Sequence, residues 1–190
     1  MSYPHPRLLT LVSLSLVLSL VPQLQAENWP QWRGPKNDGI SNEKDLPVTF
    51  SPTEGVVWKL DLPGPAGSTP VVWEDMIYLT SIDGDKLVLI GANTAGKEIW
   101  RQTLATGNRD VRNDEGNSAS PSPCTDGKHV WAFFANGVLG CYTWDGKEVW
   151  KLDVQDRYGK LKIAFGMTST PVLDGGRLYL QLIHGEGNPK

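Results

Sequence analysis

The sequence predicts an all-β fold, a β-propeller whose blades are four antiparallel strands. A segment that starts at Pro70 recurs at Pro123 and Pro171, after 53 and 48 residues, which fits the period of a propeller blade. The 190 residues include 20 glycines, 14 prolines and 8 tryptophans, a composition typical of β structure with many turns. A β-helix would need shorter coils, and a helical solenoid would need a 3.6-residue periodicity, which is absent.

The charge balance excludes two broad classes of protein. Charged residues make up 21% of the chain and its net charge is −3. These values exclude a polyelectrolyte tail and a strongly basic nucleic-acid binder, so no nucleic-acid partner is expected.

Residues 1–26 are predicted to be a signal peptide. Arg7 is their only charge, and the apolar run Leu8–Val21 is shorter than the span of about 20 residues that a membrane requires. The alternative, a buried core helix, would need an amphipathic face. Cleavage near Ala26 would leave 190 − 26 = 164 residues with no membrane span, and the exact cleavage site stays open. Because the first cysteine is Cys124, no lipid anchor is expected, and the protein is predicted to be periplasmic or secreted.

Residues 27–55 are predicted to form an N-terminal segment that covers an exposed part of the propeller. Trp29 and Trp32, together with Pro30 and Pro35, are the residues expected to make this cover.

Two sequence elements define each blade. The first runs from a proline through a turn pair to an aromatic residue eight positions later, which is a β-hairpin signature. The second is Gly-Lys-Glu-x-Trp, at Gly96–Trp100 and Gly146–Trp150, and Val57–Asp61 matches Val149–Asp153 without the Gly-Lys. Each unit therefore reads as four strands, and in the second unit these are expected near 122–126, 129–135, 138–143 and 147–153. The expected blades cover 68–103, 119–154 and, in part, 168–190.

The blade spacing also predicts a loop-bearing face. Polar inserts near 105–118 and 155–166 connect the last strand of one blade to the first strand of the next, so they should share one face, where binding usually occurs. Residues 56–61 read as an outermost strand that precedes any blade and would close a ring. Since propellers need about 4–8 blades, we expect the 190 residues to be the N-terminal part of a longer chain, with the remaining blades in a missing C-terminal part.

The pattern of Ser-Thr-Pro (68–70 and 169–171), hairpin turn, aromatic residue and Gly-Lys-Glu-x-Trp resembles the PQQ-like β-propeller repeat family. That family includes pyrroloquinoline-quinone (PQQ) alcohol dehydrogenases and a periplasmic outer-membrane assembly scaffold. The opening Asn28–Pro35 is similar to the start of exported bacterial propellers of this kind, many of them without an assigned activity. The resemblance covers about 28–182. It implies that Trp100 and Trp150 lie between neighbouring blades, each indole flat against backbone.

No residue is nominated as catalytic, cofactor-binding or metal-ligating. The insert Arg109–Glu115 lacks the ligand spacing of an EF-hand loop and is interpreted as a solvated charge run, with a calcium or substrate site as the alternative. His5, His129 and His184 are scattered, and the chain contains no zinc spacing, nucleophile elbow or phosphate loop. Trp73 and Trp144 lie beside turns and are expected at partly exposed surfaces.

Cys124 and Cys141 fall on the first and third strands of one blade. At the usual strand spacing this separates them by about 9.5 Å, whereas a disulfide needs Cα atoms within about 7 Å. Both are expected to be free and buried, with a disulfide as the alternative. The resemblance implies an adjacent cysteine pair beside the cofactor of the quinone dehydrogenases, and this sequence has none.

Two functions remain open at this stage. The first is a non-catalytic binding or scaffold module that takes an envelope protein or glycan on its loop face. The alternative is a PQQ-dependent oxidoreductase of the alcohol or sugar dehydrogenase type, with PQQ and calcium on the propeller axis, and it rests on the resemblance alone. An axial Asp and Glu with an adjacent cysteine pair would discriminate the two. A sensor domain, the third possibility, would need a membrane span or kinase that the sequence lacks.

Overall fold

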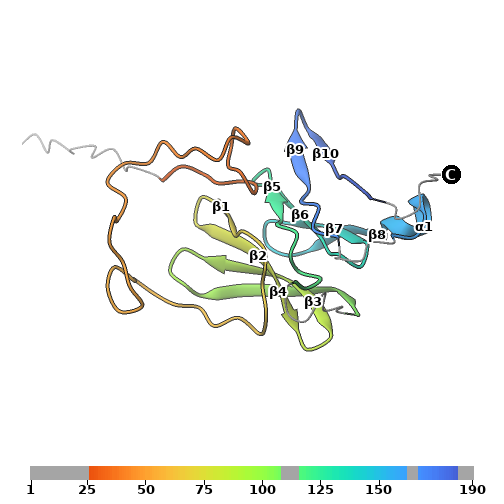
Figure 1. Ribbon diagram of the computed structural model, residues 1–190, viewed down its shortest axis with the longest axis horizontal. Coiled ribbons are helices and arrows are strands. Elements are labelled where there is room, and N and C mark those ends of the chain that lie inside the picture. The colour runs from red at the N-terminus through yellow and green to blue at the C-terminus, as the bar shows by residue number, and fades with distance from the viewer. Residues whose placement is uncertain (1–25, 108–115, 162–166, 184–190) are drawn as a thin grey trace, which may run out of the picture.

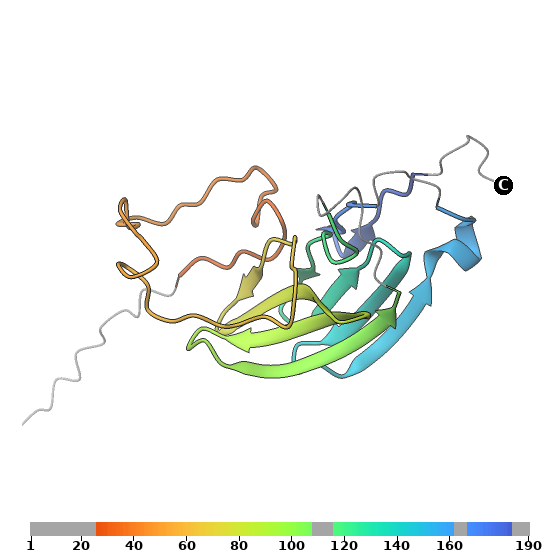
Figure 2. The same cartoon turned by 60° about the horizontal axis from the view of Figure 1, so that its bottom comes forward.

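The computed structural model describes residues 26–107, 116–161 and 167–183. It contains two four-stranded antiparallel sheets, which lie side by side, and a separate two-stranded hairpin (Figures 1 and 2). In each large sheet the strands follow one another in chain order, which is the arrangement within a propeller blade. The predicted fold class, all-β with four-stranded antiparallel blades and an incomplete ring, is confirmed.

The strand bounds follow the repeat. The first blade consists of β1 (Val71–Trp73), β2 (Met76–Asp83), β3 (Lys86–Asn93) and β4 (Glu98–Thr106). The second consists of β5 (Cys124–Thr125), β6 (His129–Phe133), β7 (Val138–Thr143) and β8 (Glu148–Asp153). The third begins with the hairpin of β9 (Val172–Asp174) and β10 (Arg177–Tyr179).

Tight turns with left-handed backbone separate the strands, as the turn pairs predict. Gly96 and Gly146 have φ of +80° and +88° in the β3–β4 and β7–β8 turns, where glycine carries no Cβ penalty. In the β1–β2 turn the left-handed residue is Glu74 at φ +51°, which is unusual for a residue with a side chain.

Among the described residues, two of the three core clusters lie between blades. One cluster joins the two large sheets. It contains Leu87, Leu89 and Leu104 of the first blade, Val130 of β6 in the second blade, and Phe134, which directly follows β6. A second cluster joins the second blade to the third hairpin. Its members are buried or partly buried apolar residues, among them Phe133, Leu139, Val154, Met167, Leu178 and Leu180. Each blade therefore buries one sheet face against its neighbour, and the first blade also has a cluster of its own, formed by Leu79, Val88 and Ile90 with Ile77 packed against them.

A short helix follows the second blade, where the sequence predicted only a polar insert. The helix α1 spans Val154–Tyr158. The Asp153 carboxylate caps its N-terminus by accepting from the Gln155 N–H at 2.8 Å, and Gly159 ends it at φ +92°. Within the described residues, the structure has no helix of the length and hydropathy that crossing a membrane would need.

Candidate functional site

The antiparallel strands give the blades two ends. At one end lie the turns β1–β2, β3–β4, β5–β6, β7–β8 and β9–β10, and we call this the hairpin end. At the other lie the β2–β3 and β6–β7 turns and the chain segments that connect one blade to the next, and we call this the loop end. The candidate functional surfaces are these two ends, and three kinds of contact between blades determine their shape.

The first kind of contact is a tryptophan that packs on a glycine turn of the following blade. A Cβ on Gly146 would lie 2.7 Å from Trp100 Cδ2, and one on Gly91 would lie 2.3 Å from Cε2, so backbone contacts both faces of this indole. The Trp100 Nε1–H donates to the Trp144 carbonyl at 3.1 Å. These contacts agree with the position between blades that the resemblance implies for Trp100.

Trp58 makes the equivalent contact with the first blade. A Cβ on Gly96 would lie 2.5 Å from Trp58 Cδ2, and the Trp58 Nε1–H donates to the Thr94 carbonyl at 2.8 Å. Residues 56–61 are assigned to no strand, so their role as a ring-closing strand stays a prediction. Trp150, the third member of the series, is 38% exposed, and no glycine turn contacts it within the described part of the chain.

The second kind of contact is a hydrogen-bonded series of hydroxyl residues, each of which precedes the proline that opens a blade. The Thr69 N–H donates to Ser122 Oγ at 2.8 Å, and the Ser122 N–H donates to Thr170 Oγ1 at 3.2 Å. Each blade is thus bonded to the next at equivalent positions. Ser122 is 3% exposed while Thr69 and Thr170 are partly exposed, so loss of these bonds would leave the buried polar groups of Ser122 unpaired.

The third kind of contact is made by residues 28–34, which we call the strap. The innermost strands of the three blades present three equivalent N–H groups, each two residues after the opening proline, and three consecutive strap residues accept from them. Val72 donates to the Trp29 carbonyl at 2.9 Å, Thr125 to the Pro30 carbonyl at 2.9 Å and Leu173 to Gln31 Oε1 at 3.1 Å. Figure 1 shows this N-terminal segment passing beside β1 and β5 toward the third hairpin.

The strap is held in shape by local contacts. The Trp29 N–H also donates to the Val72 carbonyl at 2.9 Å, which makes a two-way bridge with β1. Asn28 Oδ1 accepts from the N–H of the left-handed Glu74 at 2.6 Å and so supports that turn. Gly34, at φ +76°, lies against the Trp29 ring, where a Cβ would approach to 2.8 Å. The sequence predicted that Trp29 would cover the propeller, but it carried no signal for a link across three blades.

At the loop end, side-chain amides tie the bases of both inter-blade connections together. Asn136 Nδ2 donates to the Thr106 carbonyl at 3.3 Å, which joins the β6–β7 turn to the end of β4. Gln155 Nε2 donates to the Asn136 carbonyl at 2.7 Å, and its Oε1 accepts from the Leu161 N–H at 3.0 Å. The first blade, the second blade and α1 thereby form one polar platform. The insert Arg109–Glu115 lies outside the described residues.

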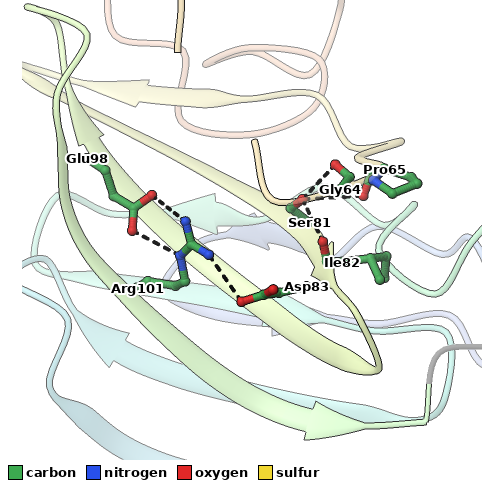
Figure 3. Close-up of polar contacts among 7 residues, drawn as sticks. All are labelled: Gly64, Pro65, Ser81, Ile82, Asp83, Glu98 and Arg101. Carbon is green, nitrogen blue, oxygen red and sulfur yellow. Dashed lines mark hydrogen bonds and ion pairs between the residues drawn. The ribbon is translucent and has the colours of Figure 1, made fainter. Parts of the chain in front are cut away.

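Figure 3 shows polar contacts along β2 and β4 of the first blade. The Arg101 guanidinium donates to both carboxylate oxygens of Glu98, at 2.9 and 2.8 Å, and to Asp83 at 3.2 Å, and these contacts raise its pKa. The Ser81 hydroxyl donates to the Gly64 carbonyl at 3.0 Å, which fixes the chain that enters the blade. Because Arg101 and its partners are partly exposed, we expect the ion pairs to contribute about 1 kcal/mol or less.

The two cysteines are free and buried, as predicted. Trp131 pairs with Cys124 on one side and with Cys141 on the other, so a whole strand separates the thiols. Burial raises the thiol pKa of Cys124 to about 12 and that of Cys141 to about 11. Two protonated, separated thiols of this kind are inert.

The remaining residues from the sequence analysis do not converge on a reaction centre. His129 starts β6, and its Nδ1 lies 3.7 Å from the Asp126 carboxylate. His5 and His184 lie outside the described residues. Trp144 is 54% exposed, as predicted, and Trp73 is partly buried against Gly127. Over residues 26–107, 116–161 and 167–183, no three His, Cys, Asp or Glu side chains are grouped where they could hold a metal ion.

Comparison with known proteins agrees with this geometry. No curated protein matches the chain. Among solved structures, it is similar to the quinohemoprotein alcohol dehydrogenase from Comamonas testosteroni, with a TM-score of 0.51 and 17% identity, over 80% of this chain and 22% of that one. The chain thus spans about a fifth of that structure, and at this identity the likeness shows the fold alone. The model of a PQQ-like repeat family, described as outer membrane protein assembly factor BamB, matches residues 43–187. Because this match covers three quarters of the sequence, the chain belongs to that family of PQQ-like propeller repeats.

Proposed function

We propose that the chain is a propeller module that holds an envelope protein or glycan at its loop end and catalyses no reaction itself. The observation that carries the proposal is the amide network of Asn136 and Gln155, which fixes the bases of both inter-blade connections on one platform. Loops that share one end of a rigid scaffold are the usual form of a binding surface.

The proposal includes export to the periplasm or beyond the cell. Its support is the sequence of residues 1–26, which has a single positive charge, an apolar run of signal-peptide length and a small residue before Glu27.

The alternative function is PQQ-dependent oxidation of an alcohol or sugar. The resemblance implies that such a site needs an adjacent cysteine pair and axial carboxylates. The residues present do not fit it, because Cys124 and Cys141 are on different strands and their thiols are buried on either side of Trp131. At the hairpin end, moreover, one N–H group of each inner strand is already bonded to the strap. We therefore derive no step through PQQ.

The test uses the full-length protein as bait in envelope extract. Tyr158, on α1, is 50% exposed at the loop end, whereas Trp144 is 54% exposed at the hairpin end. We expect Tyr158→Ala to reduce capture of a specific partner and Trp144→Ala to leave it unchanged.

The same preparation is then mixed with PQQ and calcium. We expect no rise in the unfolding temperature, whereas a ligand that binds only the native state would raise it further as the ligand concentration increases. Turnover of alcohols or sugars, together with capture that is insensitive to Tyr158→Ala, would contradict the proposal.

A further inference from the structure

The strap and the residues that follow it, Pro35, Lys36 and Asn37, form a cleft with the third hairpin, β9 and β10. The cleft has a volume of about 510 Å³ and lies at the hairpin end, opposite the loop end. Gln31, Lys36 and Asn37 line one wall, and Asp174 and Tyr179 line the other. Its volume falls within the range of small-molecule sites, about 300–1,000 Å³.

Gln31, which lines this cleft, carries an unpartnered donor group. The side chain is 7% exposed, and its Oε1 accepts from the Leu173 N–H at 3.1 Å. That bond fixes the amide orientation, because a backbone N–H can donate only to the oxygen. Nε2 then has no hydrogen-bond partner within the described residues. Nε2 is accessible to solvent, because every fully buried side-chain nitrogen or oxygen among the described residues has a hydrogen-bond partner.

The other lining groups define the chemistry of a ligand. Lys36 and Asp174 contribute opposite charges, and neither forms an ion pair within the described part of the chain, so the cleft selects for neither anions nor cations. The Asn37 amide can both donate and accept. Tyr179 is 50% exposed, and its ring offers a flat apolar surface beside these polar groups.

This combination fits a polyhydroxylated ring. Each sugar hydroxyl donates one hydrogen bond and accepts others, which matches amide and carboxylate groups, while the C–H face of the ring can lie on an aromatic side chain. An extended peptide fits less well. It would add as a strand to the inner edge of the blades, but Val72, Thr125 and Leu173 have already given their N–H groups to the strap.

We propose that this cleft binds a neutral saccharide, with one sugar ring on Tyr179 and a sugar oxygen accepting from Gln31 Nε2. The site is distinct from the loop end and does not depend on what binds there.

The test measures binding of neutral trisaccharides (maltotriose, cellotriose and chitotriose) to the full-length protein by titration calorimetry, with trigalacturonate as a charged comparator. Gln31→Glu keeps an oxygen for the Leu173 N–H but removes both donors. Tyr179→Ala removes the exposed ring, and Trp144→Ala removes a similarly exposed ring outside the cleft. Unfolding midpoints show whether each variant is folded. Because Tyr179 is 50% exposed and Gln31 is buried, we expect Tyr179→Ala to disturb folding less than Gln31→Glu does.

We expect saturable binding of at least one neutral trisaccharide. Loss of one neutral hydrogen bond should weaken it roughly five- to tenfold in Gln31→Glu. Tyr179→Ala should weaken it at least as much, and Trp144→Ala should bind as the unmodified protein does. Three results would overturn the proposal: no saturable binding by any neutral trisaccharide up to millimolar concentration, preference for trigalacturonate, or unchanged binding in folded Gln31→Glu and Tyr179→Ala.

Discussion

Replacing Trp100 with alanine should weaken the contact between the first and second blades and so lower the free energy of unfolding. The size of the effect can be worked out from the structure. A tryptophan side chain buries about 150–250 Å², which at about 25 cal/mol per Å² corresponds to about 4–6 kcal/mol when burial is complete. Trp100 is partly buried, and area estimates are upper bounds, so we expect Trp100→Ala to lower the free energy of unfolding by about 2–4 kcal/mol. That range overlaps the usual cost of truncating a core tryptophan.

Trp150→Ala is the matched control. It removes the same residue type from the same place in an outer strand, but Trp150 is 38% exposed and no glycine turn contacts it within the described residues. The sequence alone predicts several kcal/mol for both variants; because Trp150 is more exposed than Trp100, the structure lowers the expectation for Trp150→Ala below that for Trp100→Ala. Urea unfolding followed by far-ultraviolet circular dichroism measures both without relying on tryptophan fluorescence.

A glycine substitution tests the same contact from the opposite side. Gly146→Ala places a Cβ 2.7 Å from Trp100 Cδ2 at φ +88°, whereas Gly107→Ala has similar backbone strain at φ +92° and nothing within 4 Å. We expect Gly107→Ala to cost about 1–2 kcal/mol and Gly146→Ala clearly more. In a Trp100→Ala background the excess should vanish, as a double-mutant cycle would show. A cost below about 0.5 kcal/mol for Trp100→Ala, or an excess that persists without the indole, would refute the docking argument.

Three further predictions concern other parts of the chain. Mass spectrometry of the exported protein should find a new N-terminus near Glu27, and a soluble product that keeps Met1 would contradict the signal-peptide interpretation. Thiol reagents should label Cys124 and Cys141 without reduction, but only after unfolding. Because burial raises both thiol pKa values, stability should also fall as pH rises above the ordinary thiol pKa of 9.0. Removal of the strap should speed hydrogen exchange at the inner-strand amides of all three blades together, and an effect confined to the first blade would show that the strap does not link them.

The sequence predicted those parts of the fold that depend on short local motifs, and these motifs recur in each blade. Turn pairs such as Asp83-Gly84 are strong local signals, and their recurrence at a fixed period identified the blades. The match of Val57–Asp61 to the outer strands had a physical basis too, since Trp58 packs on Gly96 as Trp100 packs on Gly146. The helix α1 was missed because it has only five residues and depends on a single cap at Asp153.

The strap and the cleft could not be predicted because their contacts occur once and over long sequence separations. Gln31 and Leu173 are 142 positions apart, and a glutamine between a proline and a tryptophan gives no periodic signal. Nor does any local pattern show that three equivalent N–H groups lack strand partners on their inner side. The need of these N–H groups for an acceptor becomes visible only when the innermost strands of the three blades are compared at equivalent positions.

The strap uses these equivalent positions in unequal ways, and this inequality explains where the cleft forms. Val72 and Trp29 exchange two main-chain hydrogen bonds, and Thr125 gives one to the Pro30 carbonyl. Leu173 reaches only the Gln31 side chain, so at the third blade the strap's own backbone stands off from the inner strand by the length of a glutamine. Lys36 and Asn37 then line the space that this separation leaves. A cover over equivalent blades thereby leaves a cleft at the third blade, and Gln31 Nε2, which has no hydrogen-bond partner among the described residues, belongs to a residue that lines it.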